Sequence, residues 1–333
     1  MPPAIESATG QPATGSQPVC NPDLDIIIVS WNTREFLVKC LQSLQAALEP
    51  ASGDSRRLAG SPYRVRVMVV DNASSDHTAQ MVRQDFSWVH LIENRENLGF
   101  AHANNQAIRE SCGRFVLLLN CDTVMHPGTL ETLVTFLDTH PSAGAAGARL
   151  LNPDGSVQPA CHPMLTPWRE FWRLSFLDNV IRKSTYGARI WKATAPLQVE
   201  VIKGACLLLR RQALDQVGLL DESYFMYTEE VDLCYRLAQA GWELWWVPQA
   251  VVVHHGEGST RQVAEQMYVQ LYRSKVQFYR KFGGAEQANR YKRLLRLAYG
   301  SRLAATRLVA PLSSSSAMRA RTFGRLLAEL PGM

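Results

Sequence analysis

The chain has 333 residues, of which 46% are hydrophobic and 20% charged, a composition typical of a globular protein. Its net charge of +5 is far from the basic stripe expected of a nucleic-acid-binding protein. No apolar run approaches the ~20 residues that a transmembrane helix requires. The seven cysteines are scattered without a CxxC pair, which predicts reduced thiols in a cytoplasmic protein rather than a disulfide framework.

The first part of the chain predicts alternating strands and helices. Residues 1–22 are rich in Pro, Ala, Gly and Ser and predict a flexible tail, not a signal peptide. Short apolar runs predict strands at 25–31, 64–72, 89–94 and 114–120. Apolar residues at helical spacing predict helices at 33–48, 76–85, 101–111 and 128–140. The segment 49–63 has the Pro, Gly and Ser content of a loop. This alternation predicts an α/β fold with a mostly parallel central sheet flanked by helices.

Polar side chains follow several of these strands. In parallel sheets ligands bind beyond the carboxyl ends of the strands. Four residues at or just past those ends converge on one edge: Asn32, Asp71, Asn97 and Asp122. Asp71 is either a structural turn residue or an acceptor of a hydrogen bond from a base or ribose.

Asp122 stands in the motif LLLNCDT, directly after a wholly apolar strand. Three interpretations are open. The strand could reach the surface there, since Asp and Asn favour turns. Asp122 could cap the helix that begins near Pro127. Finally, its carboxylate could hold a metal ion.

Beyond residue 150 the alternation decays. Residues 158–196 contain several aromatic and basic residues without clear periodicity. A strand and a helix are expected within 199–218, a helix at 229–241 closed by Gly241, and a paired strand or hairpin at 242–255. From Glu265 onward the chain is expected to be helical and increasingly basic.

Two further stretches carry candidate chemistry. Glu229, Glu230 and Asp232 crowd one predicted helix start, where the helix dipole stabilises negative charge. The aromatic residues just before them would also suit a shielded carboxylate with a shifted pKa. His254 and His255 end an apolar strand, either as packing residues or by giving one imidazole to a metal.

Phosphate-binding glycine motifs are missing, because the sequence has neither GxGxxG nor GxxxxGK[ST]. If a nucleotide diphosphate binds, its charge must therefore be neutralised in another way. A divalent metal is the usual substitute.

Six motifs in order resemble a family 2 glycosyltransferase with the GT-A fold: IIIVSWN, VVVDNASSD, ENLGFAHANN, LLLNCDT, FMYTEEVDLCYR and VVVHHGEGS. The resemblance spans roughly residues 24–260 and is strongest to the bacterial rhamnosyltransferase branch. It implies an inverting transfer from a nucleotide-diphosphate sugar, with dTDP-rhamnose favoured, to a glycan or lipid-linked acceptor. It also implies Mg²⁺ or Mn²⁺ as cofactor.

The resemblance assigns roles by motif position. Asp71 would bind the base or ribose, and Asp122 would ligate the metal under the diphosphate with His254 as a second ligand. Glu230 falls at the position of the catalytic base, with Glu229 and Asp232 beside it. The residues that would bind the nucleotide sugar are Ser30, Asn32, Asp71, Asn97, Gly99, Asn104 and Asp122.

The sequence departs from the family pattern at two positions. Cys121 replaces the usual proline of the metal motif, and Glu230 replaces the usual aspartate. The longer glutamate moves the carboxylate outward by one methylene, which matters in chemistry sensitive to ~1 Å. Two alternatives stay open: a sugar-phosphate nucleotidyltransferase and a non-catalytic carbohydrate-binding relative.

The expected domains are a tail over 1–22, a GT-A domain over 23–262 and a basic helical extension over 263–333. In the extension, basic residues recur at 290, 292, 293, 296, 302 and 307, while Tyr291, Leu294, Leu295, Ala298 and Leu308 can share one face. Such a helix can lie on an anionic membrane, or it can pack its leucines on the catalytic domain. The first interpretation predicts a cytoplasmic enzyme bound peripherally to the inner face of the plasma membrane.

Overall fold

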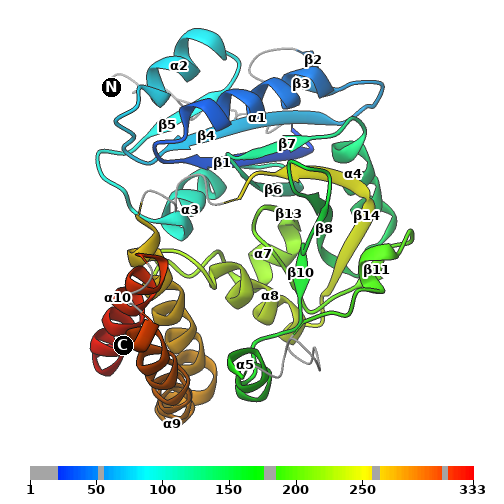
Figure 1. The fold of residues 1–333 in the computed structure, drawn as a ribbon. Coiled ribbons are helices and arrows are strands. Elements are labelled where there is room, and N and C mark those ends of the chain that lie inside the picture. The colour runs from blue at the N-terminus through cyan, green and yellow to red at the C-terminus, as the bar shows by residue number, and fades with distance from the viewer. Residues whose placement is uncertain (1–21, 52–55, 176–184, 257–262, 310–313) are drawn as a thin grey trace, which may run out of the picture.

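The computed structural model describes residues 22–51, 56–175, 185–256, 263–309 and 314–333 (Figure 1). The predicted tail lies outside these residues, apart from Pro22. The strands of the main sheet are β1 (Leu24–Ser30), β2 (Leu48–Pro50), β3 (Arg56–Leu58), β4 (Arg64–Asp71), β5 (His90–Glu93), β6 (Phe115–Asn120), β7 (Thr123–Met125), β8 (Ala143–Leu151), β9 (Val157–Gln158), β11 (Leu197–Gln198), β13 (Cys206–Arg210) and β14 (Glu243–His254). A separate pair consists of β10 (Cys161–His162) and β12 (Val201–Ile202).

The helices cover the sheet and form the C-terminal part of the molecule (Figure 1). They are α1 (Arg34–Ala47), α2 (Thr78–Asp85), α3 (Phe100–Glu110), α4 (Thr129–Thr139), α5 (Pro167–Leu174), α7 (Arg211–Val217), α8 (Glu229–Gln239), α9 (Ala264–Val309) and α10 (Ser314–Glu329). Short 3₁₀ turns are η1 (Ile190–Lys192) and η4 (Leu330–Gly332). Within the described residues, no helix is both long and apolar enough to cross a membrane.

The centre of the sheet is parallel, as expected. Strand β1 pairs in parallel with β4 on one side and with β6 on the other, and β5 extends the parallel part beyond β4. The β1 residues Ile26, Ile27 and Ile28 are fully buried, because helices cover both faces of a parallel sheet. Helices α1 and α2 lie on one face and α3 on the other (Figure 1). The chain therefore changes direction between β1 and β6, the place where open α/β sheets bind ligands.

The register aligns the carboxyl ends of the central strands. Ser30 lies opposite Asp71, and Val29 lies opposite Asn120. Strand β13 runs antiparallel between β6 and β8. Strand β14 runs parallel to β8 and antiparallel to the short β7, which places His254 opposite Thr123.

The C-terminal residues form a helical bundle beside α8. Gly284 has a φ of 73° and breaks α9, and the chain folds back so that the hydroxyl groups of Tyr268 and Tyr299 lie 2.6 Å apart. Helix α10 then packs along both arms, with Arg273 2.8 Å from Glu329. The residues 264–283, 285–309 and 314–329 are called the C-terminal bundle below.

A buried acid fastens this bundle to α5. Glu170 is 2% exposed and accepts hydrogen bonds from Lys275 at 2.9 Å and from Tyr291 at 2.8 Å, one residue from each arm of α9. Burial opposes the charge of Glu170, but Lys275 and Arg173 outweigh it and lower its pKa to about 2. Each of these charges would be buried without compensation if its partners were removed. The bundle and the α/β part therefore share one interior.

Several local predictions need correction. The segment predicted as a loop at 49–63 contains the antiparallel pair β2 and β3, whose charged edge residues hide the strand pattern. The stretch 158–196, where no periodicity was seen, holds β10, α5 and η1. Of the two alternatives for 242–255, the paired strand is confirmed and the hairpin is wrong, because β14 is one long strand paired with β8 and β7. Five described cysteines are free and buried, whereas Cys112 is disulfide-bonded, so the prediction of reduced thiols is wrong at Cys112.

Candidate functional site

A cavity of about 970 Å³ opens at the carboxyl ends of the central strands. Its lining from the first half of the chain includes Val29, Trp31, Asn72, Asn97, Asn120 and Asp122. Its lining from the second half includes His162, Lys203, Tyr227, Glu230, His254 and Met267. The volume lies at the upper end of the range for small-molecule sites, enough for more than one ligand.

Asp122 and His254 meet in this cavity. The Oδ1 atom of Asp122 lies 3.2 Å from Nε2 of His254. Asp122 is only 6% exposed, which excludes a strand that simply reaches the surface. The N-cap of α4 is Gly128, with no side-chain capping bond, which excludes Asp122 as the cap. Neither the surface interpretation nor the cap interpretation of Asp122 therefore fits the structure.

The ring of His254 is held in one tautomer. Its Nδ1 lies 2.7 Å from Oε1 of Gln158, an acceptor, so Nδ1 carries the proton. The amide Nδ2 of Asn120 lies 3.2 Å from Nε2 and donates to it. In this tautomer the lone pair of Nε2 accepts the hydrogen bond from Asn120, and Asp122 lies beside the same ring nitrogen. The ring of the neighbouring His255 packs at a tilt against Phe36 instead, with ring centroids 5.2 Å apart, as expected when successive side chains point to opposite sides.

The two donors fit a divalent cation whose remaining ligands come from elsewhere. Among the described residues, no group of three or more His, Cys, Asp or Glu side chains could hold a metal ion. A carboxylate and a neutral imidazole can bind Mg²⁺ or Mn²⁺ when phosphate oxygens and water complete the coordination. The pair therefore suits a cation that arrives with a phosphorylated ligand.

Cys121 does not take part in this chemistry. It is 5% exposed, and its sulfur lies 3.1 Å from Oγ1 of Thr33. Burial raises the pKa of its thiol to about 12, so it stays protonated at neutral pH. The replacement of the usual proline thus adds a packing contact and no ligand.

The structure separates the predicted nucleotide-binding residues into two groups. Asn97, Gly99 and Asp122 line the cavity. The described residues lining it do not include Ser30, Asn32, Asp71 or Asn104. These four hold the frame instead; for example, Ser30 bonds Thr33 at 2.9 Å and Asn104 donates to the carbonyl of Phe100 at 2.8 Å.

Asp71 lies directly behind this wall. Its Oδ1 is buried without a hydrogen-bond partner among the described residues, and burial raises the pKa of its carboxyl. Its neighbour Asn72 does line the cavity and donates to Oδ1 of Asn97 at 2.8 Å. Orphaned acceptors are rare in native interiors, so Asp71 has spare capacity for a ligand donor such as a base N–H.

Gly99 is required for a close approach of two loops. It has a φ of 85°, and a Cβ at this position would lie 2.5 Å from the carbonyl oxygen of Phe225. The next residue, Phe100, donates its backbone N–H to that same carbonyl at 2.8 Å. Any side chain at Gly99 would push apart the segments before α3 and before α8.

Glu229 and Glu230 begin helix α8 and both line the cavity. The two preceding residues, Tyr227 and Thr228, have φ values of 67° and 73°, a conformation that non-glycine residues rarely adopt and that recurs at functional sites. Burial raises the pKa of Glu229 well above its usual range and also raises that of Glu230. Both acids have an Oε2 without a hydrogen-bond partner among the described residues.

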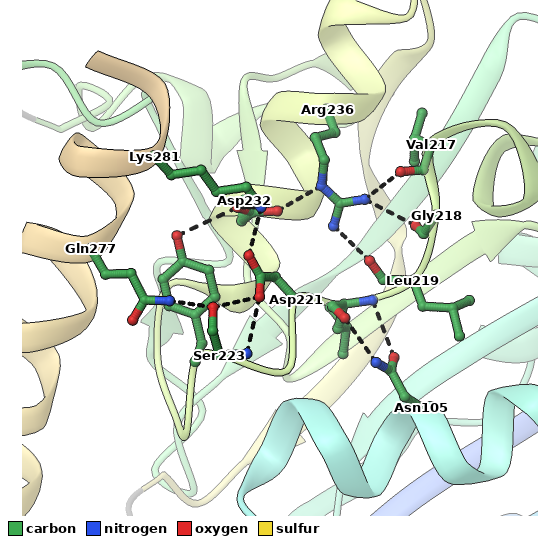
Figure 2. A network of polar contacts seen from close by, with 12 residues as sticks. Asn105, Val217, Gly218, Leu219, Asp221, Ser223, Asp232, Arg236, Gln277 and Lys281 are labelled. Atoms are coloured by element: carbon green, nitrogen blue, oxygen red, sulfur yellow. Dashed lines mark hydrogen bonds and ion pairs between the residues drawn. The ribbon is translucent and has the colours of Figure 1, made fainter. Parts of the chain in front are cut away.

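Asp232 lies elsewhere. It is fully buried, and its carboxylate lies 2.6 Å from both Arg236 and Lys281 (Figure 2). Arg236 also donates to the carbonyl groups of residues 217–219, and Lys281 to Asp221. Asp232 therefore fixes α8 to the preceding loop and to the C-terminal bundle, and the structure does not bring it into the cavity with Glu229 and Glu230.

Sequence reasoning missed several cavity residues. Asn72 directly follows Asp71 in the motif VVVDNASSD. Lys203 is the single charge in the apolar stretch VIKGACLLL, which was a usable signal. Gln158 and His162 lie in the stretch without periodicity, where no sequence pattern pointed to them.

Comparisons with known proteins show the family of the chain. The family model described as Glycosyl transferase family 2 matches residues 25–218. An N-acetylglucosaminyl-diphospho-decaprenol L-rhamnosyltransferase of Mycobacterium tuberculosis is 33% identical over 71% of this chain and 77% of its own length. Rhamnosyltransferase WbbL of Escherichia coli K12 is 27% identical over 71% of this chain and 84% of its own.

Solved structures show the fold. The mannosyltransferase PcManGT from Pyrobaculum calidifontis, in complex with GDP-Man and Mn²⁺, has a TM-score of 0.52 at 19% identity, covering 93% of this chain and 86% of its own. GalNAc-T7 with UDP, GalNAc and Mn²⁺ has a TM-score of 0.50 at 15% identity, covering 78% of this chain and 50% of its own. The expected GT-A fold is confirmed.

Proposed function

The chain belongs to glycosyltransferase family 2 and is a glycosyltransferase, and from this premise we propose that it catalyses an inverting, metal-dependent transfer of a sugar from a nucleotide diphosphate. The observation that carries the proposal is the single cavity that unites the Asp122–His254 pair with Glu230. Family membership decides against the nucleotidyltransferase and the non-catalytic relative.

The donor half of the cavity is proposed to hold the nucleotide sugar. Asn72 and Asn97 line the place for the nucleoside, with the orphaned carboxylate oxygen of Asp71 behind them. Asp122 and His254 would hold Mg²⁺ or Mn²⁺, which when bound would stabilise the charge that develops on the departing diphosphate. The similarity to two rhamnosyltransferases favours dTDP-rhamnose as the donor.

Glu230 is proposed as the general base. Its carboxylate removes the proton from an acceptor hydroxyl, and that oxygen forms a bond to the anomeric carbon while the bond to the diphosphate breaks on the opposite face. Burial gives a carboxylate the raised proton affinity that this task requires. Glu229 is adjacent and buried, and because burial raises its pKa well above its usual range, its neutral form is favoured beside Glu230.

The acceptor is proposed to be a glycan carried on a lipid. The second half of the cavity has an apolar wall made by Phe225 and by Met267 and Leu271 of the C-terminal bundle. The similar protein of M. tuberculosis is named for a diphospho-decaprenol acceptor. We accordingly divide the chain into a catalytic domain over 23–262 and an extension over 263–333 that completes the acceptor side.

A membrane-bound acceptor would place the enzyme at the cytoplasmic face of the membrane. In the bundle, Tyr291 and Leu295 are buried, so this part of the expected apolar face packs inside the molecule, whereas Leu308 is 82% exposed. Its outer face instead carries the exposed arginines Arg293, Arg296 and Arg307. These charges support peripheral contact with anionic lipids.

The test is an assay of nucleoside diphosphate release from a panel of activated sugars, with a lipid-linked glycan acceptor, before and after metal removal. We expect release from dTDP-rhamnose that stops with EDTA and resumes with Mg²⁺ or Mn²⁺. Release that persists in EDTA would contradict the metal-dependent mechanism. Release from another sugar only would change the donor and leave the reaction class intact.

A further inference from the structure

A partly buried lysine lies in the acceptor half of the cavity, and the reaction described above does not use it. Lys203 stands in the turn between β12 and β13, where its backbone N–H donates to the carbonyl of Ala160 at 2.9 Å. Its side chain lines the cavity. Within the described chain, its ammonium forms no ion pair and no side-chain hydrogen bond. Removing a cation even partly from water without giving it a fixed partner costs solvation free energy, and such groups concentrate at functional sites.

The turn that carries Lys203 packs against the start of α8. A Cβ at Gly204 would lie only 3.8 Å from the Cβ of Glu230. Lys203 and Glu230 line the same cavity and act on each other electrostatically, since Glu230 favours the charged form of Lys203 and Lys203 favours the charged form of Glu230. The geometry thus places a positive charge beside the proposed base.

Glu230 needs such a charge because its other neighbours do not supply one. The titratable side chains that line the cavity with it or lie on α8 are Cys121, Asp122, His162, Lys203, Tyr227, Glu229, Asp232, Cys234, Tyr235, Arg236, His254 and Tyr268. Glu229 is a second acid that disfavours ionisation of the pair. Burial lowers the pKa of His162 to about 4, so its imidazole is neutral at physiological pH. Arg236 is paired with the buried Asp232, so Lys203 is the cation of this set that acts on Glu230.

We propose that Lys203 is a positioning residue that holds Glu230 ionised and aimed at the acceptor hydroxyl. The inference rests on the proposed role of Glu230. When Glu230 takes the proton from the acceptor, the pair loses its attraction. Before the proton moves, Lys203 thereby offsets the burial that disfavours the charged form of Glu230.

The experiment is a pH profile of kcat between pH 5.5 and 9.5 at saturating donor and acceptor. The variant Lys203→Met removes the charge and keeps the length of the side chain. Its acid limb should move to higher pH, with a loss on the order of tenfold at the lowest pH that shrinks toward alkaline pH. Lys203→Arg should restore the wild-type limb. Lys192→Met, at an exposed lysine, is the matched control.

Three results would overturn the inference. A loss of the same factor at every pH would make Lys203 structural. A raised KM for the acceptor with an unmoved acid limb would make it an acceptor contact. An unchanged profile would make it irrelevant. Should Lys203→Met fail to fold by circular dichroism, Lys203→Gln tests the same charge. A wild-type chain that transfers no sugar contradicts the proposed function itself and, with it, the role of Lys203.

Discussion

The ammonium of Lys281 lies 2.6 Å from the carboxylate of Asp232, two residues after Glu230 on helix α8 (Figure 2). This pair connects the C-terminal bundle to the helix that carries the proposed base. The bundle also supplies part of the cavity wall through Met267 and Leu271. The bundle therefore contributes a contact to helix α8 and part of the cavity wall, although the family match ends at residue 218.

Asp232→Asn should therefore reduce stability more than catalysis. The change leaves Arg236 and Lys281 without their shared buried acid, and breaking such a pair costs about 3 kcal/mol. Urea unfolding should show this loss, while the folded enzyme keeps turnover within about tenfold of wild type. Asp221→Asn, which removes only one contact of Lys281, should cost less. Unchanged stability with a hundredfold loss of turnover would instead make Asp232 part of the chemistry.

Asp122→Asn should abolish sugar transfer and leave the fold intact, because the change removes charge and keeps volume. Circular dichroism and thermal unfolding should match the wild type, and Mn²⁺ binding should be lost in calorimetry. Asp154→Asn, at an exposed turn, is the control and should behave as wild type. Near-normal turnover of Asp122→Asn with metal present would remove Asp122 from the proposed site.

Glu230→Gln should lower kcat by a factor of about 10²–10⁴, because the amide cannot accept the proton. Donor affinity should stay close to wild type, since the carboxylate acts on the acceptor. Glu229→Gln keeps the same buried volume and should lose far less activity. If the two variants lost the same factor, the assignment of the base to Glu230 would be wrong.

Gln158→Leu should weaken metal binding without changing either proposed ligand. The amide oxygen of Gln158 accepts a hydrogen bond from Nδ1–H of His254, and this tautomer leaves Nε2 without a proton. Losing such an outer contact costs about 10–100-fold in metal affinity. Calorimetric titration with Mn²⁺ measures the effect without any substrate. The exposed Gln198→Leu serves as control, and equal affinities for the two variants would show that the tautomer does not depend on Gln158.

The proposed membrane contact can be tested without truncation, which would unpair the buried Glu170. Replacing the three exposed arginines Arg293, Arg296 and Arg307 by glutamine should lower binding to phosphatidylglycerol vesicles on the order of 100-fold at low salt. The control replaces Arg57, Arg83 and Arg109, exposed arginines outside the bundle, and carries the same change in net charge. Equal sedimentation of both triple variants would exclude the bundle as the contact.

The sequence predicted the fold and part of the site for a clear physical reason. Strands and helices of the first half follow strong local periodicity, and parallel strands bring their carboxyl ends together. The meeting of Asp122 with His254 also needs the pairing of β7 with β14, a contact between distant segments that periodicity does not encode.

The sequence misled where tertiary contacts decide the role of a side chain. Asp232 shares a crowded helix start with Glu229 and Glu230, and only the position of Lys281 shows that it faces away from the cavity. Tyr291, Leu295 and Leu308 of α9 belong to one predicted membrane face, yet the first two are buried and only Leu308 is exposed. Lys203 lies outside the six sequence motifs, and only the fold brings Glu230 close to it.

The insertion of β14 beside β8 and β7 has a consequence for protein synthesis. The ribosome delivers Asp122 early, whereas His254 becomes available only after most of the chain has emerged. Until β14 joins the sheet, a nascent chain has the residues of the donor half but lacks the Asp122–His254 pair. The cavity wall from α9 is synthesised later still. On the proposed mechanism, prematurely released chains are therefore inert and not enzymes with relaxed acceptor choice.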